Sequence, residues 1–121
     1  MLEIINRKRG RSVIRITGNT DTAINLSHLS VNTSIEQITS AEIDLVISTG
    51  NGYWKIYRGD SATGNVVLDL FENNRIKFSQ YQLSVSTNST SNIFVTNSGT
   101  GGTLLIEVSK QATYIPALTD F

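Results

Sequence analysis

Residues that could catalyse a reaction are few in this chain, and none stands in a known catalytic spacing. His28 is the only histidine, and a serine nucleophile needs a base of this kind beside it. No Gly-x-Ser-x-Gly elbow is present in the sequence. His28 lies in register with Ile24 and Leu26, so we interpret it as a partly buried strand histidine with a hydrogen-bond partner. We therefore predict that the protein is not an enzyme and has no catalytic residue.

Acidic residues give equally weak signals for chemistry. Glu42 and Asp44 are two positions apart, so a strand would place them on one face, as in the carboxylate pairs of glycosidases. Such acidic pairs more commonly point from a sheet into solvent, and we favour this interpretation over catalysis. Asp60 with Asn65 is too sparse for a calcium loop, which needs several oxygen ligands. Cysteine is absent from the sequence, and we expect no metal and no cofactor.

Two short motifs are better explained by turns than by ligands. Arg58-Gly59-Asp60 spells a tripeptide that some cell-adhesion receptors bind, but Gly and Asp are also typical of hairpin loops. The run from Gly99 to Gly102 has the composition of a phosphate loop. It lies between two predicted strands and opens no helix, so it lacks the helix N-terminus that binds phosphate. We interpret it as a flexible hairpin turn.

A basic run near the N-terminus is the first feature that suits binding to another protein. It comprises four of the ten basic residues of the chain, namely Arg7, Lys8, Arg9 and Arg11. Two interpretations stay open: a solvated loop between two strands, or a patch that contacts an acidic partner surface. Nucleic-acid binding is disfavoured, because no aromatic residues that could stack on bases are interleaved with the run.

The C-terminal end is the second such feature, because it is rich in apolar residues. Tyr114, Ile115, Leu118 and Phe121 surround the only proline of the chain, Pro116. We predict that residues 111–121 form an extended tail that packs either on its own domain or on a neighbouring subunit. In the second case it would complete an unpaired sheet edge of that neighbour.

Alternation of apolar and polar residues predicts a series of short strands, because successive side chains point to opposite faces of a strand. Ile14 and Ile16 share one face of a predicted strand, and Trp54 and Ile56 share one face of another. We expect Trp54 to lie in the core. The segments 53–57 and 66–71 predict a β-hairpin.

The segment 42–48 predicts another half-buried strand. Strict alternation places Ile43, Leu45 and Ile47 on one face and Val46 on the other. Four further segments are assigned less directly from the sequence. They are a strand at 22–29, a weaker strand at 35–38 that could instead be a short helical turn, and a final hairpin formed by strands at 93–95 and 103–108.

Eight or nine short strands with turns every 8–12 residues predict an all-β fold, an antiparallel β-sandwich of the jelly-roll-like kind. The chain has 121 residues, which suits one sandwich domain at 1–110 followed by the extended tail at 111–121.

The surface is polar through 14 Ser, 14 Thr and 11 Asn rather than through charge, and the net charge is zero. Neutrality argues against broad binding to nucleic acid or to an anionic membrane. No apolar run approaches the roughly 18–20 residues of a membrane helix, and we expect no Sec-type signal peptide in residues 1–11.

Five segments between residues 53 and 110 form a recognisable series of strand and turn patterns. They are Trp54-Lys55-Ile56-Tyr57-Arg58-Gly59, Asn65-Val66-Val67-Leu68-Asp69-Leu70, Arg75-Ile76-Lys77-Phe78, Ile93-Phe94-Val95-Thr96 and Leu104-Leu105-Ile106-Glu107-Val108. In these segments the sequence resembles small virion structural proteins of tailed bacteriophages, particularly the decoration, or cement, proteins on the heads of marine podovirus-like phages. The resemblance covers about half of the chain and includes no catalytic signature.

The resemblance implies a protein on the outer capsid surface of the virion, bound to the major capsid protein and stabilising its lattice. It also implies a homo-oligomer, either a trimer or a dimer. The candidate partner-binding residues are Arg7, Lys8, Arg9, Arg11, Tyr114, Ile115, Leu118 and Phe121. The alternative function is a phage tail or fibre β-domain that binds a host glycan or another virion protein. Such a platform would expose Trp54 or its aromatic neighbours.

Overall fold

The computed structural model describes residues 2–8, 11–18, 21–30, 36–59, 65–78 and 90–114. Within these ranges the chain forms nine β-strands and one short 3-10 helix, η1. In chain order they are β1 (Leu2–Lys8), β2 (Arg11–Thr17), β3 (Thr22–Ile24), η1 (Leu26–Leu29), β4 (Glu36–Thr49), β5 (Tyr53–Arg58), β6 (Asn65–Phe71), β7 (Asn74–Lys77), β8 (Ile93–Asn97) and β9 (Thr103–Tyr114).

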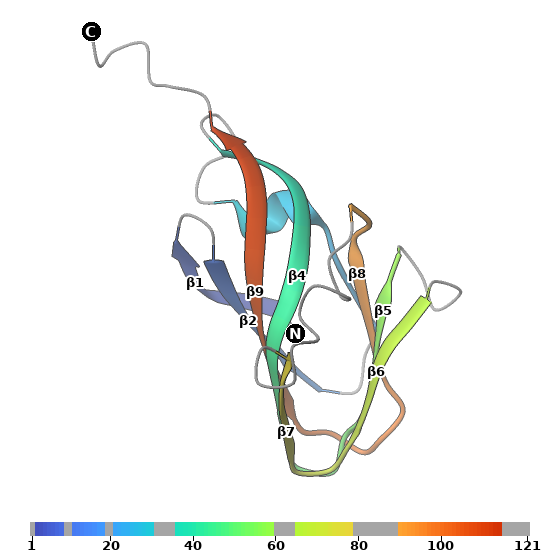
Figure 1. The fold of residues 1–121 in the computed structure, drawn as a ribbon. Coiled ribbons are helices and arrows are strands. Elements are labelled where there is room, and N and C mark those ends of the chain that lie inside the picture. The colour runs from blue at the N-terminus through green and yellow to red at the C-terminus, as the bar shows by residue number, and fades with distance from the viewer. Residues whose placement is uncertain are drawn as a thin grey trace, which may run out of the picture.

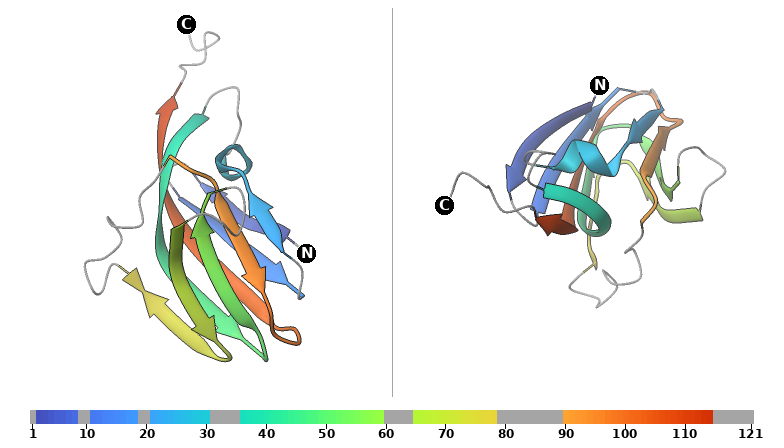
Figure 2. Two further views of the ribbon diagram at one scale, coloured as in Figure 1. Left: turned by 90° about the vertical axis from the view of Figure 1, so that its right-hand side faces the viewer. Right: turned by 90° about the horizontal axis from the view of Figure 1, so that it is seen from above.

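The strands form two antiparallel sheets that pack face to face, as Figures 1 and 2 show. One sheet has five strands in the order β1-β2-β9-β4-β7, and the other has four in the order β3-β8-β5-β6. The pairing is nested: β5 pairs with β6, β4 with β7, β3 with β8, and β2 with β9. A long hairpin rolled up on itself gives this order, which is that of a jelly roll with β1 added at one edge. The predicted antiparallel, jelly-roll-like sandwich is thus confirmed.

The core lies between the two sheets and follows the predicted alternation in most strands. In β2, Ile14 and Ile16 are fully buried while the residues between them are partly exposed. Trp54 and Ile56 of β5 have 0% exposure, which confirms the prediction for Trp54. Burying a large apolar side chain contributes about 1.5–3 kcal/mol, so these alternating positions supply most of the favourable free energy of folding.

Two local predictions are wrong, and two others are made more precise by the structure. The predicted strand at 22–29 is divided into β3 and η1, whereas residues 36–38 belong to strand β4 rather than to a helical turn. The predicted final hairpin does not form, because β8 and β9 lie in different sheets. The predicted tail at 111–121 begins inside β9, since Gln111 pairs with Ser40 and Tyr114 with Glu36 of β4.

Asn97 joins three chain connections at one end of the sandwich. Its side-chain oxygen accepts from the backbone N–H groups of Tyr53 and Gly99, each at 2.9 Å. Its side-chain nitrogen donates to the carbonyls of Gly18 and Gly101, at 2.8 and 3.0 Å. An Asn side chain offers two acceptor sites and two donors, so this residue, only 5% exposed, is fully satisfied.

The segment after Asn97 is closely packed rather than flexible as predicted. Thr100 N–H donates to the carbonyl of Asn51 at 3.2 Å. A Cβ on Gly102 would lie 2.5 Å from the carbonyl oxygen of Thr49, and this glycine has a φ of +104°. The chain can therefore cross here from the four-stranded to the five-stranded sheet only because a residue without a side chain occupies the crossing.

Arg58 and Lys110 close the opposite end of the sandwich. The Arg58 guanidinium, 6% exposed, donates to the carbonyls of Ala41 and Ser91, each at 2.6 Å. It thereby links β5 of one sheet to β4 of the other. Lys110 donates to the carbonyl of Leu29 at 2.7 Å and so ties β9 to η1. Burial lowers the pKa of Arg58 to about 10, which still leaves it protonated at neutral pH.

We predict that Asn97→Ala lowers the free energy of unfolding by about 3 kcal/mol or more. The substitution removes the partner of four partly buried backbone groups, and each loss costs about 1 kcal/mol. Asn73→Ala is the matched control, because Asn73 accepts one exposed hydrogen bond from Gly50 and its loss should cost about 1 kcal/mol or less. Urea unfolding of the two variants measures the difference, and equal costs would contradict the role assigned to Asn97.

Candidate functional site

The predicted basic residues lie mainly in paired strands rather than in a loop. Arg7 and Lys8 end β1, and Arg11 begins β2. Arg7 pairs with Ser12 and Lys8 with Arg11 across an antiparallel hairpin. The prediction of a basic loop is thus wrong for these three residues, and Arg9 lies outside the described residues. The hairpin brings Lys8 and Arg11 to directly opposite positions.

The hairpin and the end of β9 lie at the same end of the five-stranded sheet. Arg11 pairs with Ser109, and β9 continues from there to Tyr114, paired only with β4 in the part of the chain that the structure describes. Figure 1 shows the upper parts of β4 and β9 reaching beyond the neighbouring strands. The structure thus brings together the basic run and the start of the tail, whereas Ile115, Leu118 and Phe121 lie outside the described ranges.

A β-bulge in β4 decides which of its side chains face outward. The pairing with β9 shifts register between Ile43 and Leu45, so Asp44 is an extra residue. Beyond the bulge Val46 is fully buried, while Leu45 and Ile47 are only partly buried. The prediction that Ile43, Leu45 and Ile47 share one face is therefore wrong, because an extra residue reverses the alternation of every following side chain.

The outer face of the five-stranded sheet has an apolar centre that follows from this reversal. Pairing places Leu105 of β9 beside Ile47 of β4. Two residues further along β9, Glu107 lies between Val13 of β2 and Leu45 of β4. These residues are partly exposed on the face opposite to the core. One charged residue, Glu107, lies within this centre, and the others surround it: Glu3, Arg11, Arg15, Asp44, Arg75 and Lys77. An apolar centre with a polar rim is the usual arrangement of a protein–protein interface.

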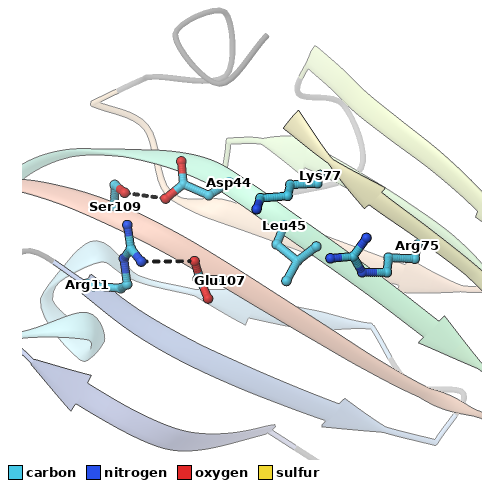
Figure 3. Close-up of a pocket in the computed structure, with 7 residues that line it drawn as sticks. All are labelled: Arg11, Asp44, Leu45, Arg75, Lys77, Glu107 and Ser109. Atoms are coloured by element: carbon cyan, nitrogen blue, oxygen red, sulfur yellow. Dashed lines mark hydrogen bonds and ion pairs between the residues drawn. The ribbon is translucent and has the colours of Figure 1, made fainter. Parts of the chain in front are cut away.

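A shallow depression of about 310 Å³ lies within this face. Figure 3 shows its lining side chains, with those of Arg75 and Lys77 reaching from β7 toward Leu45. The lining residues are Arg11, Asp44, Leu45, Arg75, Lys77, Glu107 and Ser109. The depression therefore combines side chains from four adjacent strands. Three of these side chains are cationic and two are acidic.

The charges in the depression are only partly neutralised by one another. Arg11 and Glu107 form an ion pair at 3.4 Å, and the Ser109 hydroxyl donates to Asp44. Among the described residues, the side chains of Arg75 and Lys77 have no hydrogen-bond or ion-pair partner. Exposed ion pairs contribute little to stability, about 1 kcal/mol or less. The arrangement therefore suits recognition of an acidic group on a partner more than stabilisation of the fold.

The described residues give no support for catalysis or metal binding at this face. No histidine lines the depression, and His28 is exposed in η1 rather than partly buried in a strand, which corrects the prediction. Asp44 is hydrogen-bonded to Ser109 rather than paired with Glu42. No cluster of three His, Asp or Glu residues in the described ranges could hold a metal ion. Within the same ranges no helix has the length and apolar character needed to cross a membrane.

The arginine of the Arg58-Gly59-Asp60 tripeptide is buried and does not face a partner. Arg58 points into the sandwich, where Ala41 and Ser91 accept its hydrogen bonds. Asp60 lies outside the described residues. The burial of Arg58 removes one of the two charges that such a receptor would contact. Arg58 itself ends strand β5 rather than lying in the predicted turn.

Sequence reasoning missed most of this surface. The alternation Arg75-Ile76-Lys77 did place two cations on one face of a strand, and this signal could have identified them. No sequence signal marks the extra residue Asp44, and hence none identifies Leu45 and Ile47 as outward-facing.

Comparison of the chain with protein-family models, with curated proteins and with solved structures finds no match.

We predict that Val46→Thr destabilises the protein by about 1–3 kcal/mol, because it buries a hydroxyl group in the core. Val13→Thr is the matched control, since the same change on the outer face should cost less than about 0.5 kcal/mol. Chemical denaturation measures both values. A larger cost for Val13→Thr than for Val46→Thr would show that the extra residue of the bulge in β4 is not Asp44.

Proposed function

We propose that this chain is a structural virion protein, a decoration protein that binds the outer surface of a tailed-phage head and stabilises the lattice of the major capsid protein. The proposal rests on the resemblance of residues 53–110 and on the outer face of the five-stranded sheet. That face is the single observation that carries it, because a broad surface with an apolar centre and a charged rim suits docking onto another protein. The fold alone does not imply this function, since jelly rolls serve many.

The basic hairpin would give the docking face its charge complementarity. Arg11 belongs both to the hairpin and to the depression, so the two regions form one continuous contact surface. Cations at the rim of an interface mainly raise the rate of association and select an acidic partner. The apolar centre formed by Val13, Leu45, Ile47 and Leu105 would supply the part of the affinity that does not depend on salt.

Stabilisation of a capsid follows from mass action. A protein that binds the assembled lattice but not its separated subunits shifts the equilibrium toward the lattice. Each copy contributes only its own binding free energy, but the effect is repeated at every equivalent site of the shell. A broad binding face with a shallow depression is sufficient for this task, and catalytic groups are not required.

A second candidate function is glycan binding by a tail or fibre domain. Burial of Trp54 removes the best aromatic platform. Tyr53 and Phe71 remain on the outer face of the four-stranded sheet, with their ring centroids 5.2 Å apart, and Phe71 is 59% exposed. This exposed pair is the one observation that favours a glycan, and Phe71→Ser should abolish such binding without affecting attachment to heads.

We predict that the purified protein co-sediments with DNA-filled heads of the phage that encodes it, and that binding saturates at a fixed ratio to the major capsid protein. Heads carrying the protein should withstand higher temperature before releasing DNA, as followed by a fluorescent dye. Unexpanded proheads are the comparison sample, because their lattice presents different subunit contacts. Binding to isolated tails or to a glycan array, with none to heads, would contradict the decoration function.

Replacing Arg7, Lys8, Arg9 and Arg11 with Ser should weaken attachment to heads about tenfold and flatten its dependence on salt concentration. The reason is that ionic strength screens exposed charges beyond about 10 Å at 0.1 M salt. Lys55→Gln is the control, because Lys55 is a cation on the other sheet. An unchanged affinity and salt dependence would mean that the hairpin is merely solvated.

A further inference from the structure

Strand β7 is an edge of the five-stranded sheet and pairs regularly with its neighbour. It stands last in the strand order β1-β2-β9-β4-β7, and its four residues pair with consecutive residues of β4 without a register shift. In the part of the chain that the structure describes, no strand pairs with the other side of β7. Such an edge binds a further extended strand through main-chain hydrogen bonds.

The other edge strands carry features that oppose strand addition. Ile5 in β1 and Val67 in β6 are extra residues, because the pairing with the neighbouring strand shifts register at each of them. Strand β3 has only three residues. Bulges and short length are the usual protection of sheet edges. Strand β7 is also short, but its ladder is regular, so its charge decides which strand it accepts.

A hydrogen bond shows which backbone groups of β7 face the open side. The N–H of Arg75 donates to the side-chain oxygen of Asn74 at 2.8 Å, in an exposed contact, so this N–H is turned away from β4. Backbone groups alternate in direction along a strand. Those of Lys77 therefore face the open side as well, whereas those of Ile76 face β4. An incoming strand can bond to the backbone of Arg75 and Lys77 by displacing the side chain of Asn74.

The side chains of Arg75 and Lys77 supply the charge that selects the incoming strand. Both are exposed and lie on the outer face of the sheet, as Figure 3 shows. Arg11 and Arg15 on the same face are each paired with a glutamate, whereas the side chains of Arg75 and Lys77 have no partner among the described residues. Opposite charges at directly opposed positions stabilise paired strands, and like charges destabilise them. Two acidic residues two positions apart therefore match this edge, and a second cationic strand does not.

The residue between the two acids must face the inner side of the sheet, because successive side chains of a strand alternate. On that side Ile76 lies opposite the buried residue Val46. Ile76 packs against the core but is only partly buried. An apolar residue in the middle of the incoming segment would cover it. The edge therefore fits a segment in which an apolar residue stands between two acidic ones.

We propose that β7 binds an extended acidic–apolar–acidic segment of a partner protein, which adds to the five-stranded sheet beside β7. The two acidic side chains contact Arg75 and Lys77, and the apolar side chain covers Ile76. The inference rests on the proposed function, because it names the kind of segment that one edge of the docking face binds. It is tested without phage heads, so that each of the two proposals can fail separately.

Nuclear magnetic resonance titration of the isotope-labelled full chain tests the pairing. The probe is a short synthetic peptide centred on Glu-Val-Glu, and the matched control peptide is centred on Lys-Val-Lys. The Glu peptide should shift the amide signals of Arg75 and Lys77. It should also slow hydrogen exchange of the Lys77 N–H at least about threefold, because a main-chain hydrogen bond protects an amide from exchange. The N–H of Ile76, which faces β4, is the internal reference and should change little.

Charge reversal tests the selection of acidic residues by a separate route. The double variant Arg75→Glu, Lys77→Glu should bind the Glu peptide at least about tenfold more weakly than the wild type and should bind the Lys peptide instead, because each opposed pair of charges changes sign. Lys55→Glu is the matched control, since Lys55 is a cation on the other sheet, and it should leave both affinities unchanged. Melting temperatures of the variants confirm that they are folded.

Three results would overturn the inference. The first is the absence of any shift at millimolar concentrations of the Glu peptide. The second is equal binding of the Glu and Lys peptides, which would show that charge does not select the segment. The third is binding of a single-stranded oligonucleotide through Arg75 and Lys77 without binding of the Glu peptide, which would assign these cations to phosphate groups.

Co-sedimentation with heads separates this inference from the proposed function. A wild-type chain that binds heads but not the Glu peptide would disprove the strand addition and leave the decoration function in place. A wild-type chain that binds the Glu peptide through β7 but does not bind heads would support the strand addition and disprove the decoration function.

Discussion

Buried hydrogen bonds where the chain passes from one sheet to the other are the constraint on which this fold depends. A rolled-up hairpin must cross between its two layers at both ends, and each crossing takes backbone groups away from the strand ladders. Asn97 satisfies four such groups at one end, and Arg58 with Lys110 satisfies three carbonyls at the other. Without these side chains the apolar core could form only by burying unsatisfied polar groups, which costs about 1–3 kcal/mol for each.

The nested strand order has a second consequence, which concerns where the molecule is most firmly held. Strand β9 is the longest-range element, because it pairs with β2 on one side and with β4 on the other. Strands β5 and β6, by contrast, are joined by a local hairpin. Strand β2 from the N-terminal part and strand β9 from the C-terminal part therefore pair inside the five-stranded sheet, while β6 from the middle of the chain is an edge strand of the other sheet. Docking residues such as Arg11 and Leu105 thus stand on strands that have a neighbour on each side.

The sequence predicts those features that depend on local alternation and misses those that depend on tertiary contacts. Ile14, Ile16, Trp54 and Ile56 are assigned correctly to the core because their strands keep a strict period of two. Ile47 is assigned to the wrong face because the extra residue at Asp44 has no signature of its own. His28 is predicted in a strand and Arg58 in a turn, and both predictions are wrong. The position of each residue depends on contacts with distant segments of the chain, and local sequence patterns carry no information about such contacts. For the candidate site, Arg11 is anticipated by the basic run, but the apolar centre becomes visible only once the bulge is known.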